Sequence, residues 1–312
     1  MEKCPFFGKC GGCKYDFTSP EYQQQKITSL PNITPTDSPI WIQSGTRRRA
    51  DFCFAPNQFG FYETKSKNIV NIEYCPNLTD GINKILPLMH KIPWCGTGAC
   101  LITECDNGID IAITSSVPYF TPDFRAAALQ LPAIRITWND KIIKQTQQPT
   151  VTFGEHTVQY PSNAFLQPSI QGADQLRKLV QIHAHGHTKI ADLFCGLGNF
   201  TFALNATGFD IVGTGIKRDL FSHPLTVGML NQYDCIIMDP PRAGAQKQCA
   251  ELIKSNITKV IYISCNPNTW ISDANILKSG GYDNTVTIPV DQFIGSNHWE
   301  IFSVFEKHET EK

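Results

Sequence analysis

Long apolar runs are missing from this sequence of 312 residues, since none reaches the roughly 18 residues that would cross a bilayer. The first ten residues, MEKCPFFGKC, lack the basic segment and apolar core of a secretory signal. An excess of charge is also missing, because 27 Lys and Arg face 28 Asp and Glu. These absences predict a cytoplasmic protein without a membrane partner, in which any nucleic-acid site is a local patch.

Cysteine, by contrast, is abundant, with 12 residues. In a cytoplasmic chain, thiols act as metal ligands, catalysts or packing groups rather than in disulfides. Cys4, Cys10 and Cys13 lie close together near the start, with two glycines between the last two. On physical grounds alone, such a group holds zinc or an iron–sulfur cluster equally well. Three later cysteines are interpreted as buried packing residues, namely Cys195, Cys235 and Cys249.

Composition and periodicity divide the chain into three parts. Residues 1–37 are rich in Cys, Gly and Gln and have little periodicity, which is typical of a loop module around a ligand. In residues 38–160, short alternating runs such as ADFCFA and GIDIAIT predict antiparallel strands with few helices. In residues 161–312, a helix over QGADQLRKLVQIHAHG precedes the apolar runs KIADLF, FDIVGT, DCIIMD, KVIYIS and EIFSVFE. We therefore predict an α/β protein with a Rossmann-like C-terminal domain, a β-rich central domain and a small N-terminal module.

Two loops of the C-terminal domain are candidates for a cofactor site. In ADLFCGLGNFTF, a strand ends at Asp192, and Gly196 and Gly198 open the turn into a helix. Glycine there lets backbone approach a ligand, although the spacing is not GxGxxG. DPPR, at 239–242, ends the strand DCIIMD, so both loops fall at strand ends, where open α/β sheets bind ligands. The alternatives are a structural glycine turn and a proline pair that only forces a turn.

Cys265 follows the strand KVIYIS and is the candidate nucleophile, because it falls at the same sheet edge as the two loops. Uracil C5 becomes nucleophilic only after a thiolate adds to C6, and a base must later remove the C5 proton. His298 and Glu300 are the candidate bases, since alternation along HWEIFSVFE puts both on one side of a strand. The alternative interpretation of this stretch is a solvated edge.

Together these segments resemble the RNA uracil-C5 methyltransferase family of class I S-adenosylmethionine-dependent enzymes. The resemblance is carried by FLQ at 165–167, DLFCGLGNF at 192–200, DPPRAGA at 239–245, SCNPNT at 264–269 and DQFIGSNHWE at 291–300. It implies methylation of C5 of a uridine in RNA, with Cys265 as nucleophile, Glu300 as base and Phe165 stacking on a base. It also implies that four residues line the methyl-donor and target pocket, namely Gln167, Phe194, Asn199 and Asp239.

The iron–sulfur members of the family carry a CxxxxxCGGC motif and a later fourth cysteine. The resemblance therefore implies a [4Fe–4S] cluster held by Cys4, Cys10, Cys13 and Cys75, so that the first part is an iron–sulfur module. It further implies a monomer that acts on RNA, most specifically 23S rRNA, with tRNA uridine methylation as the alternative. The basic segment TRRRADF, at 46–52, is expected to meet RNA phosphates or the surroundings of the cluster, or else to be a solvated turn.

One region departs from the family pattern. Class I methyltransferases hold the cofactor ribose with an acid after the second strand, and the matching position here is Gly215. Only about 40 residues separate Asn199 from Asp239, so we expect a shortened domain that lost a strand–helix–strand segment around 214–217. By resemblance, Asp219 faces the adenine and is expected to approach the ribose instead. The expectation is weak cofactor binding, and the alternative is a catalytically silent RNA-binding homologue.

Overall fold

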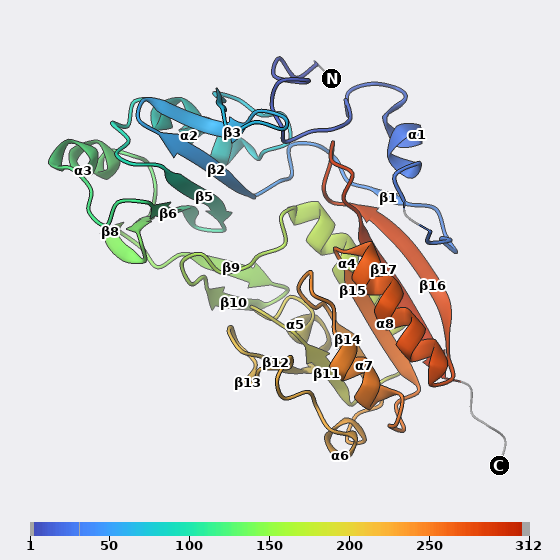
Figure 1. Ribbon diagram of the computed structural model, residues 1–312. Helices are drawn as coiled ribbons and strands as arrows, with labels where there is room; N and C mark the ends of the chain where they lie inside the picture. The colour runs from blue at the N-terminus through green and yellow to red at the C-terminus, as the bar shows by residue number, and fades with distance from the viewer. Residues whose placement is uncertain (1–2, 31, 308–312) are drawn as a thin grey trace, which may run out of the picture. The chain divides into compact units, whose positions relative to one another are not determined.

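The computed structural model describes residues 3–30 and 32–307 (Figure 1). Contacts within the chain define two compact units. Unit 1 is built from Met1–Ser29, Gln43–Ile170 and Ile294–Asn297. Unit 2 is built from Leu30–Ile42, Gln171–Phe293 and His298–Lys312. Within the described ranges, no helix has the length and apolar character needed to span a membrane.

Unit 1 contains a seven-stranded sheet in the order β4-β3-β2-β5-β6-β7-β8. Its strands are β2 (Arg49–Ala55), β3 (Gln58–Tyr62), β4 (Ile69–Asn71), β5 (Gly98–Cys105), β6 (Gly108–Ser115), β7 (Arg135–Trp138) and β8 (Lys141–Gln145). All neighbours are antiparallel except β6 and β7, which are parallel. The predicted β-rich character of this part of the chain is therefore present in the structure.

Two helices accompany this sheet. In α2 (Asp80–Met89), Ile82, Ile85, Leu86 and Met89 are buried, at the three- and four-residue spacing of one helical face. The helix α3 (Pro122–Leu129) connects the parallel strands β6 and β7. It starts as a helix should, because the Thr121 side chain accepts the Phe124 amide hydrogen and proline occupies the first turn.

The rest of unit 1 is less regular. The N-terminal stretch up to α1 (Tyr22–Ile27) consists of turns, apart from an isolated bridge between Cys10 and Glu63. β9 (Thr150–Phe153) and β10 (His156–Gln159) form a small antiparallel hairpin, which precedes the last residues of the unit 1 segment Gln43–Ile170. The absence of long periodic runs before residue 30 agrees with a segment held by turns.

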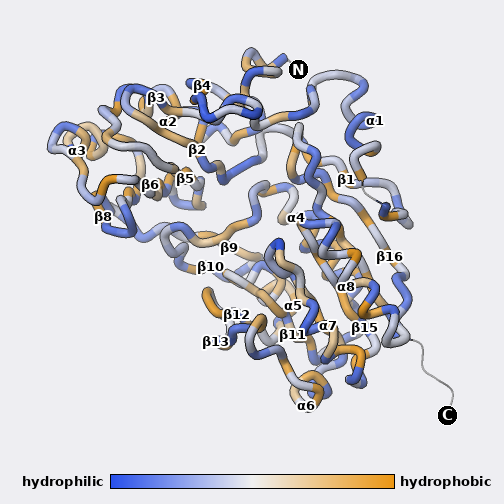
Figure 2. Tube along the Cα trace, in the orientation of Figure 1, coloured by the Kyte–Doolittle hydropathy of each residue, from blue (hydrophilic) through white to orange (hydrophobic). Residues whose placement is uncertain are grey.

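Unit 2 contains an eight-stranded sheet in the order β1-β16-β17-β15-β14-β11-β12-β13. Its strands are β1 (Ile40–Trp41), β11 (Ile190–Leu193), β12 (Thr207–Asp210), β13 (Ile216–Lys217), β14 (Cys235–Met238), β15 (Lys259–Ser264), β16 (Tyr282–Asp291) and β17 (Glu300–Lys307). Only β17 runs antiparallel to its neighbours. Figure 2 shows hydrophobic stretches along β14 and β15, whose residues are almost all buried.

Helices cover both faces of this sheet, as the alternation along β17 shows. Ser303 accepts a 2.8 Å hydrogen bond from the Trp270 indole of α8 (Pro267–Ser279), which lies beside α7 (Gln246–Leu252) (Figure 1). The adjacent Phe302 ring lies 5.4 Å from the His183 ring of α4 (Ile170–His183). The remaining helices are short, α5 (Thr201–Leu204) and α6 (Val227–Leu230). The predicted α/β architecture is confirmed.

The connection between β12 and β13 corrects one sequence expectation. We expected a strand–helix–strand segment to be lost, but both strands are present and parallel. The connecting residues 211–215 contain no crossover helix. The apolar run FDIVGT is not a strand throughout, because β12 ends at Asp210 and Ile211 and Val212 are exposed by 59% and 65%. Parallel neighbours usually need a dozen or more connecting residues, and here residues 211–215 suffice because the strands are very short.

Candidate active site

Cys265 lies directly after β15, where the chain turns into α8. Asn266 caps that helix, because its side chain accepts the Asn268 amide hydrogen at 3.2 Å, and Pro267 occupies the first helical position. The sequence Cys-Asn-Pro therefore places the thiol between a strand end and a helix N-terminus. A helix N-terminus favours negative charge nearby, which suits a thiolate.

The surroundings of the Cys265 thiol act in both directions on its pKa. Burial is the largest effect and, with the charges of Glu300 and Asp239, raises the pKa of Cys265 to about 11. The Arg242 guanidinium lowers it through its charge and a hydrogen bond. The predicted nucleophile, the predicted base and Asp239 are therefore close enough to interact. Arg242 was not among the predicted site residues, although DPPR displayed it.

Glu300 is the first residue of β17 and is only 2% exposed. Burial raises the pKa of its carboxyl group to about 7, and a hydrogen bond from the Gln292 amide opposes that rise. A carboxylate with this pKa can take up a proton near neutral pH. Gln292 lies one residue beyond the end of β16 and was not among the predicted site residues.

His298 does not share a strand with Glu300, contrary to the alternation in the sequence. It precedes β17 and is exposed, and its Nδ1 lies 3.5 Å from an Arg242 nitrogen. The alternation holds only from residue 300 onward, where pairing with β15 and β16 begins. Of the two candidate bases, Glu300 is the one whose charge acts on the Cys265 thiol.

The loop after β14 is fixed by a buried carboxylate. Asp273 of α8 accepts hydrogen bonds from the Tyr262 hydroxyl at 2.5 Å and from the Ala245 amide at 2.6 Å. At the other end of the loop, the Asp239 amide donates to the Leu193 carbonyl at 3.3 Å. Asp239 and Arg242 are thus presented by a loop that is anchored to β11, β15 and α8.

The glycine turn after β11 has the geometry of a ligand-binding loop. Phe194 has a φ of 62°, a left-handed conformation that costs energy for a residue with a side chain. Gly196 is also left-handed, at 52°, and no described atom lies within 4 Å of where its Cβ would be. The buried amide nitrogen and oxygen of Asn199 have no hydrogen-bond partner among the residues that the structure describes. Such orphaned polar atoms fit a site completed by a ligand.

Asp210, at the end of β12, is an acidic residue in contact with the glycine turn. Its carboxylate accepts the Gly196 amide hydrogen at 2.9 Å and the Val212 amide hydrogen at 3.1 Å. Residues 211–215 then pass so close to the glycine turn that a Cβ on Gly213 would lie 1.8 Å from the Gly196 carbonyl oxygen. Asp219, the predicted substitute, accepts backbone hydrogens of residues 221 and 222 in its own loop.

Gln167 belongs to unit 1 and is 6% exposed, whereas Phe165 of the same motif is 60% exposed. The Arg49 guanidinium lies 5.9 Å from the centre of the Phe165 ring. Its neighbour Arg48 is paired with Asp106 at 2.8 Å, so the basic segment is partly committed to structural contacts. An exposed aromatic ring beside a guanidinium can stack on a nucleobase.

The four predicted ligand cysteines of unit 1 line one cavity of about 170 Å³, which Arg47 and Asn77 also line. The Gly12 amide lies 3.4 Å from the Cys10 sulfur, and the Asn77 side-chain amide lies 3.6 Å from the Cys13 sulfur. Burial, followed by the charges of the other thiols, raises the pKa of Cys13 to about 12. Among the described residues, no three or more Cys, His, Asp or Glu side chains are grouped closely enough to hold a metal ion.

Comparisons with known proteins agree with this arrangement. The model of the tRNA (uracil-5-)-methyltransferase family matches residues 224–308. An uncharacterized RNA methyltransferase of Agrobacterium fabrum is 32% identical over 96% of this chain and 83% of its own length. The 23S rRNA (uracil(1939)-C(5))-methyltransferase RlmD of Salmonella typhi is 24% identical over 98% of this chain and 81% of its own length. The structure of Pyrococcus abyssi tRNA (uracil-54, C5)-methyltransferase in complex with S-adenosyl-L-homocysteine has a TM-score of 0.69 and 18% identity, covering 91% of this chain and 82% of that one.

The fold is that of a class I α/β methyltransferase. The chain belongs to a family of RNA methyltransferases, and its residues 224–308 match the model of the tRNA (uracil-5-)-methyltransferase family.

Proposed function

We propose that this protein methylates C5 of a uridine in RNA through a covalent bond between Cys265 and C6 of the base. One observation carries the proposal: the β15–β17 pairing ends at Ser264 and Ile301, so the next residues, Cys265 and Glu300, lie at the same sheet edge, where Asp239 and Arg242 also act on the pKa of the thiol. A nucleophile, a base and a cation then act on one substrate ring. This is the set of groups that the reaction requires.

The first step is addition of the Cys265 thiolate to C6. The electron pair of the C5–C6 double bond moves toward the C4 carbonyl, which makes C5 nucleophilic. Burial raises the pKa of the Cys265 thiol to about 11 even with Arg242 beside it, and Arg242 is the cation that limits this rise. Arg242 thus stabilises the charge before it passes to the base.

When bound, S-adenosylmethionine would supply an electrophilic methyl group to C5 and would leave as S-adenosylhomocysteine. C5 then carries both the methyl group and its original proton. Glu300 takes this proton, the C5–C6 double bond re-forms and the Cys265 thiolate leaves C6. A pKa of about 7 allows Glu300 to accept the proton and to release it to water before the next turnover.

The methyl donor fits residues of the glycine turn. The orphaned Asn199 amide and the open space before Gly196 support its binding there, together with Phe194 and Asp239. We assign the acid role of this site to Asp210 rather than to Asp219, because Asp210 already contacts the glycine turn.

The proposed substrate is 23S rRNA, because RlmD, which is 24% identical to this chain, is named for methylation of 23S rRNA. We propose that the chain has three functional parts. Residues 38–160 bind RNA, and residues 161–312 form the methyltransferase domain. Residues 1–37 with Cys75 form the iron–sulfur module. The [4Fe–4S] cluster is proposed from the resemblance, and the lining of one cavity by the four thiols supports it.

Covalent trapping tests the catalytic proposal. We would incubate the protein and S-adenosylmethionine with rRNA or tRNA that contains 5-fluorouridine, whose C5 carries no removable proton. The expected result is a denaturation-resistant adduct with rRNA, which Cys265→Ala abolishes and the matched variant Cys95→Ala retains. Both cysteines are partly buried, and Cys95 lies in unit 1.

Two other outcomes would redirect the proposal. An adduct with tRNA alone would move the substrate from rRNA to tRNA. RNA binding without any adduct would favour a silent RNA-binding homologue, which the short β12–β13 connection also favours.

A second experiment tests the cluster. Protein purified without oxygen should contain iron and sulfide and should lose its colour on reduction, and Cys75→Ser should lower its iron content. Bound zinc without iron would reject the cluster.

A further inference from the structure

Phe165, Leu166 and Gln167 form a three-residue segment that is fixed at both ends. Leu166 and Gln167 are 5% and 6% exposed, whereas Phe165 between them and the preceding turn is 60% exposed. An apolar ring held in water gains nothing from the hydrophobic effect. The Phe165 ring lies beside the Arg49 guanidinium, and contact with a nucleobase is one use of an exposed aromatic ring held at a fixed place.

The turn before this segment is held by side chains of the unit 1 sheet. The Tyr160 hydroxyl donates to the Ala164 carbonyl at 2.8 Å and so closes the turn from side chain to backbone. Thr137 of β7 and Ser162 share a hydrogen bond of 3.0 Å. Asn163 adopts a left-handed φ of 61° between these two contacts. The carbonyl that directly precedes Phe165 is thus bonded to a fully buried tyrosine.

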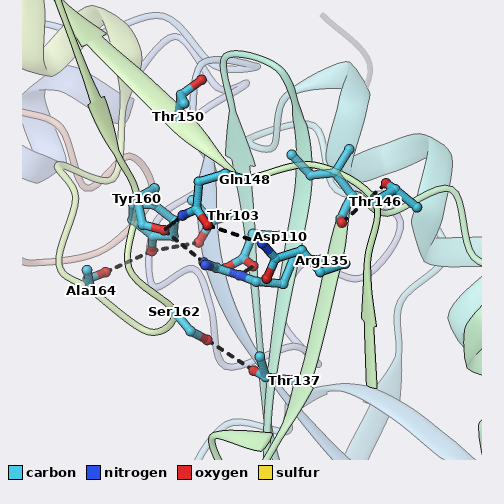
Figure 3. A network of polar contacts seen from close by, with 12 residues as sticks. Thr103, Asp110, Arg135, Thr137, Thr146, Gln148, Thr150, Tyr160, Ser162 and Ala164 are labelled. Atoms are coloured by element: carbon cyan, nitrogen blue, oxygen red, sulfur yellow. Dashed lines mark hydrogen bonds and ion pairs between the residues drawn. The ribbon is translucent and has the colours of Figure 1, made fainter. Parts of the chain in front are cut away.

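Tyr160 is itself held by a buried charged network (Figure 3). Arg135 donates to the Tyr160 carbonyl at 3.0 Å and to the Asp110 carboxylate at 2.6 Å. Both charged side chains are almost completely buried, at 5% and 1% exposure. The Thr103 hydroxyl lies 3.3 Å from the Tyr160 hydroxyl. Because a buried ion pair is rigid and costly to break, it fixes Tyr160 relative to β5, β6 and β7.

The segment is also held at its C-terminal side. The Arg48 amide donates to the Pro168 carbonyl at 2.8 Å, and the hydroxyls of Thr46 and Ser169 lie 2.9 Å apart. Only residues 165–167 remain between the two sets of contacts. The backbone of residues 165–167 is therefore held by Tyr160 on one side and by residues 46–48 on the other.

We propose that the Tyr160 hydroxyl is a positioning group for methylation, which presents Phe165 and Gln167 in the orientation that the reaction uses. This inference rests on the proposed function, because the roles of Phe165 and Gln167 come from the resemblance. Tyr160 contacts neither substrate nor cofactor in this proposal. It acts through the Ala164 carbonyl, and misplacing a substrate-orienting group by about 1 Å can cost a hundredfold in rate.

The test compares two buried tyrosines whose hydroxyls donate to carbonyls in different parts of the chain. Tyr160→Phe removes the bond to Ala164. Tyr282→Phe is the matched control, because Tyr282 is equally buried and its hydroxyl also donates to a backbone carbonyl, that of Ile257 at 2.6 Å. Melting temperature, amide hydrogen exchange, RNA affinity and the rate of covalent adduct formation would be measured for both variants.

If Tyr160 is a positioning group, the two variants should have similar melting temperatures but different rates of covalent adduct formation. Tyr160→Phe should slow adduct formation about ten- to a hundredfold and speed amide exchange at residues 164–167, while Tyr282→Phe keeps the wild-type rate. Thr137→Val should act in the same direction, and Thr137→Ser, which keeps the hydroxyl, should restore the rate.

Two results would overturn the inference, and they are distinguishable. If wild type forms adduct and Tyr160→Phe forms it equally fast, or if both tyrosine variants lose rate in proportion to their melting temperatures, positioning is wrong while the proposed function stands. If wild type forms no adduct with any RNA, the proposed function fails and the positioning role fails with it.

Discussion

Glu300→Gln should make the protein more stable at high pH, in spite of removing the proposed catalytic base. Burial raises the pKa of Glu300 to about 7 from an ordinary value of 4.5, so the folded protein holds a proton there that the unfolded chain releases. Wild type therefore loses stability as pH rises from about 4.5 to about 7. That difference in pKa corresponds to about 3 kcal/mol at pH 8. Glutamine cannot ionise, and its amide oxygen can still accept the Gln292 hydrogen bond.

Urea unfolding of both proteins at pH 4.5 and pH 8 would measure this effect. The variant should be more stable at pH 8 by up to about 3 kcal/mol, with little difference at pH 4.5. Glu306→Gln on the same strand is the control with opposite sign. The hydrogen bond from Lys259 lowers the pKa of Glu306, so that variant should be less stable than wild type at pH 8 and similar to it at low pH. A stability gain of Glu300→Gln that does not depend on pH would refute the reasoning.

Three further predictions concern the cofactor loop and the nucleophile. Gly213→Ala should weaken binding of S-adenosylhomocysteine by calorimetry far more than Gly154→Ala, because both residues are left-handed but only the first would place a Cβ 1.8 Å from the carbonyl of the glycine turn. Asp210→Ala should weaken the same binding about tenfold, and Asp210→Asn, which can still accept the amide hydrogen, should weaken it less; equal affinities would contradict the acid role. Arg242→Gln should shift the pH profile of adduct formation to higher pH, since Arg242 lowers the pKa of Cys265, and an unshifted profile would count against that role.

The sequence predicted those strands whose side chains are buried on both faces. KIADLF, DCIIMD and KVIYIS became β11, β14 and β15, because a continuous apolar run can satisfy a strand covered by helices on both sides. FDIVGT failed in its second half, since the sheet has no helix there to bury Ile211 and Val212. The apolar pattern of a sequence shows which side chains favour burial. Whether Ile211 and Val212 can be buried depends on a helix that covers them, and the β12–β13 connection contains none.

The candidate site was predictable to the extent that motifs marked it. Cys265 and Asp239 follow strand ends, and the parallel order of β14 and β15 brings such ends to one edge. Arg242 and Gln292 were missed, because their roles depend on the bonds that loop geometry gives them. Asp210 was missed because alignment by spacing from Asn199 counts residues and cannot detect that a shorter loop places an earlier acid at the strand end.

The short β12–β13 connection has a consequence for the behaviour of the protein in concentrated solution. β13 is the edge of its sheet, and Ile216 on it is 56% exposed, next to the equally uncovered Ile211 and Val212. An apolar edge with unpaired backbone groups is the surface at which sheets of neighbouring molecules add to one another. Aggregation of this protein should therefore start at this edge, and charged substitutions at Val212 or Ile216 should reduce it.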